Sequence, residues 1–295
     1  MSIKFHLPGL RRNFPINMLL LRMFENFPKF FREDIKIASF FGEFPTSLWN
    51  EGRYDGGDQC DAGYVQQVIK VVNAAGIAIR YTFTNPTITE KDLSDPYCNF
   101  CMKAGDNGRN EVLVVSPILE EYIRKNYPSY TINSSTCKEI RSIGALNDEL
   151  AKDYGLVVLD YNLNNQFAEL EHITDKKRCE VLVNACCVPN CPRRGEHYRF
   201  IATQERTVLV NRNLPQTSKN RCLSGVVSTA NKIFARRIEN IQHIFPRKQS
   251  GKLMCQWALR ILKLRGVQQI FFRLLIPTAI ILQNRSTRMM QGFCC

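Results

Sequence analysis

The chain has 295 residues and a formal net charge of +13, a length that suits one large α/β barrel or two modest domains. The charge is uneven: residues 1–218 hold 26 Lys and Arg against 26 Asp and Glu, whereas residues 219–295 hold 14 basic residues and one acidic residue, Glu239. The positive excess belongs to the C-terminal quarter, which excludes the idea that the chain as a whole is a polyanion-binding protein on grounds of charge.

From Asp34 onward, short β-branched runs alternate with amphipathic stretches, which is the pattern of βα units around a parallel sheet. The predicted strands are 35–41, 77–83, 112–116, 130–134, 156–161 and 180–184, and the predicted helices are 62–76, 118–128, 146–155 and 166–173. The strands read as continuous Val, Ile and Leu runs, as strands buried on both faces do. We therefore expect a parallel barrel or a doubly wound sheet over residues 1–218.

Small polar residues follow the predicted strands in turn: Thr82, Thr84, Asn85, Ser116, Ser134, Ser135, Thr136, Asp160, Asn162, Asn164 and Asn184. The carboxyl ends of barrel strands hold the active site, so this set predicts the rim of a pocket. The alternative is that these residues only cap the helices that follow them.

The sharpest local motif is VNACCVPNCPRRGEHY, in which Cys186, Cys187 and Cys191 crowd the end of the sixth predicted strand. Three thiols on one short turn can reach a single metal centre, and thiolates favour an iron–sulfur cluster or zinc. A fourth ligand does not follow at a recognisable spacing. The alternative is that the thiols are small buried apolar groups.

Arg194 and His197 come directly after these cysteines and are the candidate catalytic residues. Arginine offers a two-pronged donor for an anionic substrate, and histidine titrates near neutral pH. The alternative is a solvated helix face. The sequence contains no GxGxxG, P-loop, HExxH or GxSxG pattern, so nucleotide cradles and the common hydrolase sites have no support.

The other cysteines and the apolar runs indicate in which cellular compartment the protein is expected. Cys98 and Cys101 have CxxC spacing in DPYCNFCMKAGD, which we interpret as an ordinary helix start. Twelve cysteines without a secretory leader favour a reducing cytoplasm. The longest apolar run, 270–282, is shorter than the roughly 20 residues that span a bilayer, so no membrane segment is expected.

Several motifs together resemble a known family. They are MSIKFHLPGLRRNFPINMLLL, GGDQCDAGYV, RYTFTNP, LSDPYCNFC, LEEYIRKNYP, SSTCKEIR, LVVLDYN and VNACCVPNCPRRGEHY. This set is similar to a group of bacterial barrel proteins that is itself distantly similar to the collagenase-like peptidase family, peptidase family U32. The resemblance covers residues 1 to about 215.

The resemblance implies a TIM-type barrel with cysteines near its open end. In better-studied relatives such cysteines hold a 4Fe–4S cluster used in hydroxylation, and Cys186, Cys187 and Cys191 occupy the matching turn. Zinc is the alternative metal. The substrate, a small molecule or an RNA, stays open.

The resemblance stops after LPQTSKN, where the basic tail begins. If the third base of each codon is read with the first two of the next, residues 252–272 can be read as ETYVPMGFANFKVEGRTANLF, which resembles the missing end of the family. We therefore hypothesise that residues 219–295 are an out-of-frame translation and that this chain is inactive. The nucleotide sequence across codons 215–225 tests the hypothesis.

The rival interpretation of the tail is a nucleic-acid-binding arm whose phosphate contacts would be Arg236, Arg237, Arg247, Lys248, Lys252, Arg260, Lys263 and Arg265. The nucleic-acid binding expected of such an arm is non-specific.

For the fold, we expect an incomplete barrel of about six parallel strands, without its last two strands, and a helical or irregular tail that does not close the sheet.

Overall fold

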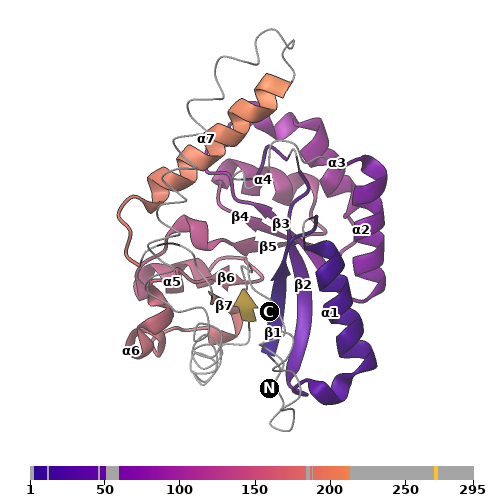
Figure 1. Ribbon diagram of the computed structural model, residues 1–295. Helices are drawn as coiled ribbons and strands as arrows, with labels where there is room; N and C mark the ends of the chain where they lie inside the picture. The colour runs from indigo at the N-terminus through magenta and orange to yellow at the C-terminus, as the bar shows by residue number, and fades with distance from the viewer. Residues whose placement is uncertain are drawn as a thin grey trace, which may run out of the picture.

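The computed structural model describes residues 3–11, 13–45, 47–50, 60–183, 187, 189–212 and 269–271. Its sheet is entirely parallel and closes into a ring in chain order (Figure 1). The strands are β1 (Ile3–Pro8), β2 (Ile35–Gly42), β3 (Ala78–Phe83), β4 (Glu111–Val114), β5 (Thr131–Ser134), β6 (Val157–Val158), β7 (Cys179–Leu182) and β8 (Gln269–Phe271).

Seven of these strands lie in residues 3–182 and form a curled sheet with alternating helices. This part of the chain is therefore an incomplete α/β barrel, as predicted. All six predicted strands are present as β2 to β7. The prediction missed β1, because Lys4 and His6 interrupt its apolar pattern and both line the amino end of the barrel.

The expectation that the tail takes no part in the sheet is wrong. Strand β8 lies in the gap between β7 and β1 and pairs with both, so three residues of the tail complete the ring. The physical reason is that β1 and β7 would otherwise present unpaired backbone groups at two open edges. The rest of 219–295, including every basic residue proposed to contact phosphate, lies outside the described residues.

The helices are α1 (Phe14–Asn26), α2 (Ala62–Ala74), α3 (Pro96–Ala104), α4 (Pro117–Asn126), α5 (Ile143–Leu150), α6 (Phe167–Leu170) and α7 (Arg194–Arg212), with 3₁₀ turns η1 (Pro28–Phe30), η2 (Glu90–Ser94), η3 (Thr136–Lys138), η4 (Leu163–Asn165) and η5 (Lys176–Arg178). Side-chain caps begin several of them: Asp61 accepts from the Tyr64 N–H, and Ser116 from that of Leu119. The predicted helix over 166–173 is only the single turn α6. None of the described helices is both long and apolar enough to cross a membrane.

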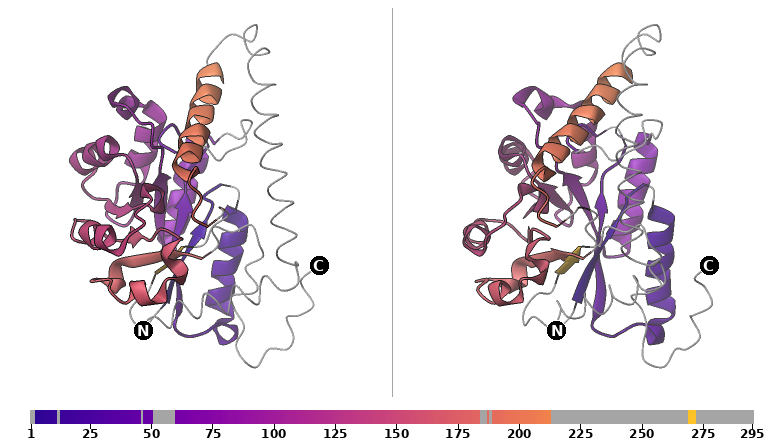
Figure 2. Two further views of the ribbon diagram at one scale, coloured as in Figure 1. Left: turned by 90° about the vertical axis from the view of Figure 1, so that its left-hand side faces the viewer. Right: turned by 60° about the vertical axis from the view of Figure 1, so that its left-hand side comes forward.

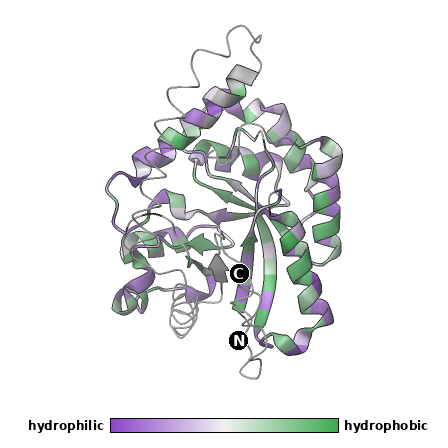
Figure 3. Cartoon of the chain, in the orientation of Figure 1, coloured by the Kyte–Doolittle hydropathy of each residue, from purple (hydrophilic) through white to green (hydrophobic). Residues whose placement is uncertain are grey.

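Two separate apolar clusters fill the fold. The larger one lies between the sheet and the helices and includes Val65 and Val68 of α2, a helix with many hydrophobic residues, drawn in green in Figure 3. The smaller one consists of Phe41, Leu113, Val158 and Leu182, from four different strands, with Tyr161 packed against it. Because side chains alternate along a strand, this second cluster fills the barrel interior, and we call it the interior plug.

The amino-end side of the interior plug is charged. Arg80 is fully buried and donates from Nη1 to both carboxylate oxygens of Glu180, at 2.8 and 2.7 Å, and from Nε to Glu111 at 2.7 Å. The His6 ring lies 3.4 Å from Glu180 and 2.7 Å from the Ser39 hydroxyl. This cluster of β1, β2, β3, β4 and β7 side chains, the interior ion network, ties together strands that are not neighbours.

Glu149 of α5 provides a pH-dependent contribution to stability. Burial opposes its ionisation, but hydrogen bonds from Lys138, Lys152 and Ser134 more than offset this and lower the pKa of Glu149 to about 2. A carboxyl whose pKa is depressed by folding stabilises the fold above its unfolded pKa and loses that effect as pH falls through its folded pKa. We expect Glu149→Gln to lower the urea midpoint at pH 7.

The same comparison at lower pH checks the cause. The difference between Glu149→Gln and the parent chain should shrink as pH falls from about 4.5 towards about 2. The matched control is Glu169→Gln, at an exposed position of α6. A Glu149→Gln defect that is the same size at both ends of this pH range would contradict the assignment.

Candidate functional site

The polar residues predicted to form a rim do lie where the strands end, and most of them are buried. Ser135, Asp160 and Asn85 are each 1% exposed. Part of the set is accounted for by capping, because Ser116 caps α4 and Ser135 caps η3. Asn184 lies outside the described residues. The remainder, together with Glu43 whose carboxylate accepts from Thr82, gives the carboxyl end of the barrel a polar lining.

Arg194, the first residue of α7, contacts residues that follow β5 and β6 at this end of the barrel. Its side chain is 1% exposed and bonds the Asp160 carboxylate through Nη2, while Nε lies 3.2 Å from Glu139. Its guanidinium also stacks over the Tyr161 ring at 4.2 Å. Burial opposes the charge, but Tyr161, Asp160 and Glu139 more than offset this, so the pKa of Arg194 lies above its usual value.

Glu139 is held in an unusual conformation. Its backbone φ is +56°, in the left-handed region that costs a non-glycine residue about 1–2 kcal/mol. Its carboxylate accepts from Arg141 as well as Arg194. A Cβ at position 195 would lie 2.6 Å from Glu139 Oε1, so a larger residue than Gly195 would make the Glu139 carboxylate shift. Backbone strain of this kind tends to occur at functional sites.

Beside this guanidinium, two phenols interact with each other and with two thiols. Burial raises the pKa of Tyr161, and the Cys187 thiol raises it further. Burial likewise raises the pKa of Tyr198 on α7, with Cys137 and Tyr161 adding to the effect. Cys137 and Cys187 follow different strands, β5 and β7, so the fold brings two sequence-distant thiols to one tyrosine pair.

The predicted cysteine turn is only partly described. Cys186 lies outside the described residues, whereas Cys187 and Cys191 are free, half-buried thiols. Arg141, two residues beyond Glu139, donates to the Cys191 carbonyl at 3.4 Å, so the segment after β5 contacts this turn. Within the described part of the chain, no three His, Cys, Asp or Glu side chains are grouped closely enough to hold a metal ion.

His197, the second predicted catalytic residue, lies one helical turn beyond Arg194 on α7 and is exposed. Its backbone N–H continues the helix by donating to the Arg193 carbonyl at 3.0 Å. The structure therefore brings Arg194 into the rim, whereas the His197 side chain is exposed. Cys98 and Cys101 start α3 as expected and are buried, and burial raises the pKa of both thiols.

Three contributors to this site were not picked out by sequence reasoning: Glu139, Tyr161 and Cys137. Cys137 was detectable in principle, because SSTCKEIR places a thiol directly after a predicted strand. Glu139 and Tyr161 carried no such signal. Glu139 reaches Arg194 across 55 positions of sequence through a left-handed turn that no motif announces.

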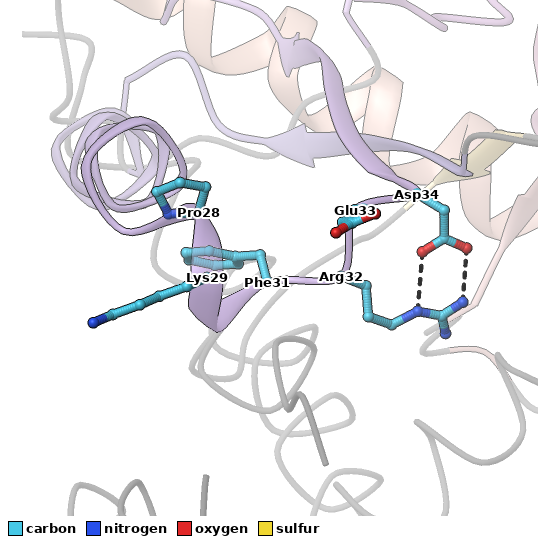
Figure 4. A pocket seen from close by; sticks show the side chains of 6 residues that line it. All are labelled: Pro28, Lys29, Phe31, Arg32, Glu33 and Asp34. Carbon is cyan, nitrogen blue, oxygen red and sulfur yellow. Dashed lines mark hydrogen bonds and ion pairs between the residues drawn. The ribbon is translucent and has the colours of Figure 1, made fainter. Parts of the chain in front are cut away.

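Two hollows in the described residues lie at the other end of the barrel. One, of about 560 Å³, is lined by the segment between α1 and β2, where Arg32 and Asp34 pair with each other and Lys29 points away (Figure 4). The other, of about 220 Å³, is lined by the starts of strands and includes His6 and Glu111. Neither adjoins Arg194.

The fold and this rim together define a parallel α/β barrel with a buried arginine cluster beside a cysteine turn. Among solved structures, the chain is similar to the U32 peptidase Mk0906, with 13% sequence identity, a TM-score of 0.47, and coverage of 75% of this chain and 83% of that one. No protein-family model matches the chain, and no curated protein matches it.

Proposed function

We propose that this barrel is the scaffold of an enzyme whose active site is the carboxyl-end rim around Arg194. The main support is that three side chains contact the buried guanidinium of Arg194. Glu139 follows β5, whereas Asp160 and Tyr161 follow β6. Burying such a charge is costly unless it is fully paired. A barrel with no chemistry at this end would gain little from the arrangement.

We further propose that the neighbouring cysteine turn holds a 4Fe–4S cluster, with zinc as the alternative. The donors fit in type, because Cys187 and Cys191 are free thiols and Cys137 lies on the segment that contacts the turn. Cys186 is the further candidate from the sequence. A thiolate-bound cluster would supply redox chemistry of the kind that the family resemblance implies.

The chain's own residues have separable roles in this proposal. Arg194 Nη1 is buried without a hydrogen-bond partner among the described residues, so it can donate to a carbonyl or carboxylate oxygen of the substrate. Asp160 and Glu139 hold the guanidinium in place. The exposed His197, three residues after Arg194, is proposed for proton transfer. The proposed reaction is hydroxylation of a small molecule or an RNA. Peptide cleavage is the alternative.

Reconstitution with iron and sulfide under anaerobic conditions tests the cluster. We expect a visible thiolate-to-iron absorption band that Cys191→Ser removes and Cys101→Ser leaves, because Cys101 is buried in the α3 packing. Cys137→Ser asks whether that thiol is a fourth ligand. A band that survives Cys191→Ser but not Cys101→Ser would reverse the assignment, and bound zinc without a band would favour the alternative metal.

Whether this chain or one with a restored reading frame is the active form depends on the origin of residues 219–295. If residues 219–295 are an out-of-frame translation, the same reconstitution performed on a chain with the frame restored should give the stronger band. Equal bands from both chains would show that the tail does not limit the site. A tight, sequence-selective DNA complex that is lost on deletion of 219–295 would instead support a nucleic-acid-binding arm.

A further inference from the structure

The cysteine turn is joined to the loop after β6 by a direct hydrogen bond. Asn190, which directly precedes Cys191, donates from its backbone N–H to Asn162 Oδ1 at 2.8 Å. Asn162 lies in the loop that follows the end of β6 at Val158. Figures 1 and 2 show α7, in orange, projecting beyond the other described helices. The turn precedes α7, so this bond holds the chain where the helix meets the barrel.

Asn190 has a backbone conformation that needs such support. Its φ is +53°, in the left-handed region that residues other than glycine seldom adopt. Asparagine tolerates this region better than most residues, but strain of this kind persists only where the surroundings hold it. The dihedral angles of Asn190 set the direction in which the chain continues to Cys191. The bond to Asn162 therefore helps to fix where the Cys191 thiol lies.

One carboxylate supports both the turn and the buried arginine. Asp160 Oδ1 accepts from the Asn162 backbone N–H at 2.8 Å, and Asp160 Oδ2 accepts from Arg194 Nη2. Asp160 is buried, so water has little access to compete for these bonds. A short hydrogen-bonded path thus runs from Arg194 through Asp160 and Asn162 to the cysteine turn. Side-chain contacts, in addition to the covalent chain, set the position of the turn relative to Arg194.

The other end of the Asn162 amide is an unused donor. Nδ2 is buried and has no hydrogen-bond partner in the part of the chain that the structure describes. The bond to Asn190 fixes the orientation of the amide, because the flipped amide would set an N–H against the Asn190 N–H. A buried donor without an acceptor is costly. A sulfur atom bound at the adjacent turn is an acceptor of the kind that Nδ2 lacks, since ligand sulfurs accept hydrogen bonds from neighbouring groups.

We propose that Asn162 is a positioning residue of the cysteine turn. Its Oδ1 holds Asn190 and thereby Cys191, and its Nδ2 donates to a sulfur atom of the metal site at the turn. The role of Oδ1 depends only on the contacts described above. The role of Nδ2 rests on the proposed function, in which the turn binds a 4Fe–4S cluster or zinc.

Hydrogen exchange of the metal-free full chain, resolved to single residues, tests the role of Oδ1. Asn162→Leu removes the acceptor and should speed exchange at the Asn190 amide about fivefold, the factor that corresponds to the loss of one hydrogen bond. Asn162→Asp retains an acceptor oxygen and should leave Asn190 protected. The matched control, Asn147→Leu, removes a similar bond to the Thr174 N–H and should leave Asn190 unchanged. Unchanged exchange at Asn190 in Asn162→Leu, or an equal rise throughout β3, would overturn this role.

The reduction potential of the anaerobically reconstituted chain tests the role of Nδ2. A hydrogen-bond donor to sulfur stabilises the more negative, reduced cluster, so loss of the donor should lower the potential. Asn162→Asp and Asn162→Leu both remove the donor, and only the first adds a charge. A lower potential in both variants supports the role of Nδ2, whereas an unchanged potential in Asn162→Leu contradicts it.

The parent chain in the same experiment separates this role from the proposed function. If the parent binds zinc and forms no cluster, Asn162→Leu should raise the zinc concentration for half occupancy about tenfold, and an unchanged concentration would refute the role of Nδ2. If the parent binds neither metal, the proposed metal site and the role of Nδ2 both fail. Exchange at Asn190 still decides the role of Oδ1 in that case.

Discussion

Arg80→Met is expected to destabilise the barrel by about 3–5 kcal/mol, because it removes one member of a buried ion pair and leaves the other uncompensated. Both Arg80 and Glu180 are fully buried, and Arg80 also bonds Glu111. Burial raises the pKa of Glu180, and Arg80 is the group that counteracts this rise. Without Arg80, the pKa of the Glu180 carboxyl should therefore rise further, which favours its protonated form.

The sign of the pH dependence follows from that protonation. In Arg80→Met, a Glu180 with a raised folded pKa is better tolerated at low pH and worse at high pH. The defect, measured as the shift of the guanidinium chloride midpoint, should accordingly be larger at pH 8 than at pH 5. The matched control is Arg193→Met, whose exposed pair with Glu196 is worth at most about 1 kcal/mol.

A double variant sharpens this test. Arg80→Met with Glu180→Leu removes both buried charges and should recover a large part of the lost stability, since an apolar pair can replace a buried ion pair at little cost. If the stability losses of the two single variants add up in the double variant, Arg80 stabilises the barrel through its packing and not through its charge. A loss below about 1 kcal/mol in Arg80→Met alone would mean that the interior ion network is not buried in solution.

Phe41→Ala is expected to cost about 3–5 kcal/mol through the cavity it leaves in the interior plug. Phe41 is 5% exposed and packs with Leu113, Val158 and Leu182 inside the ring of strands. The surrounding sheet is hydrogen-bonded around the ring, so it has little freedom to collapse into the space. Thermal and chemical denaturation should both show the loss.

The matched control for the cavity is Phe200→Ala on α7, because Phe200 is 47% exposed and its truncation should change stability by less than about 1 kcal/mol. Phe41→Leu should fall between the two, since most of the volume is retained. If Phe41→Ala and Phe200→Ala cost the same, the four plug residues do not form a packed interior.

The sequence predicted the strands best where their apolar residues form continuous runs. Strands β2 to β7 were predictable because the apolar runs that form them are buried on the sheet faces. Strand β1 was not, because Lys4 and His6 look like breaks in a strand until the barrel is seen to have a charged interior at its amino end. Strand β8 had no local signal distinct from the rest of the tail.

For the site, the sequence indicated Arg194 and the cysteine turn, but not the partners that make Arg194 unusual. Glu139 and Asp160 reach it from loops 55 and 34 positions away. Their meeting depends on the pairing of β5 with β6 and on one left-handed residue, Glu139. These are tertiary contacts, and neither hydrophobic periodicity nor motif spacing predicts them.

The role of β8 also bears on the hypothesis of a lost reading frame. Its contribution to the ring is backbone pairing with β1 and β7 over three residues. Backbone groups are the same in any frame, so a short apolar stretch of an unselected sequence can still complete a sheet. Participation of 269–271 in the barrel and an out-of-frame origin of the tail are therefore compatible.

Ring closure through β8 has a consequence for synthesis in the cell. Strand β7 ends at Leu182 and β8 begins at Gln269, so the ribosome must add residues 183–268 before the last strand exists. At about 5–20 residues per second this takes on the order of 5–20 s. During that interval β1 and β7 of a nascent chain are unpaired sheet edges that neighbouring nascent chains can join. Cellular yield should therefore respond to translation speed and to holding chaperones more than the stability of the finished barrel would suggest.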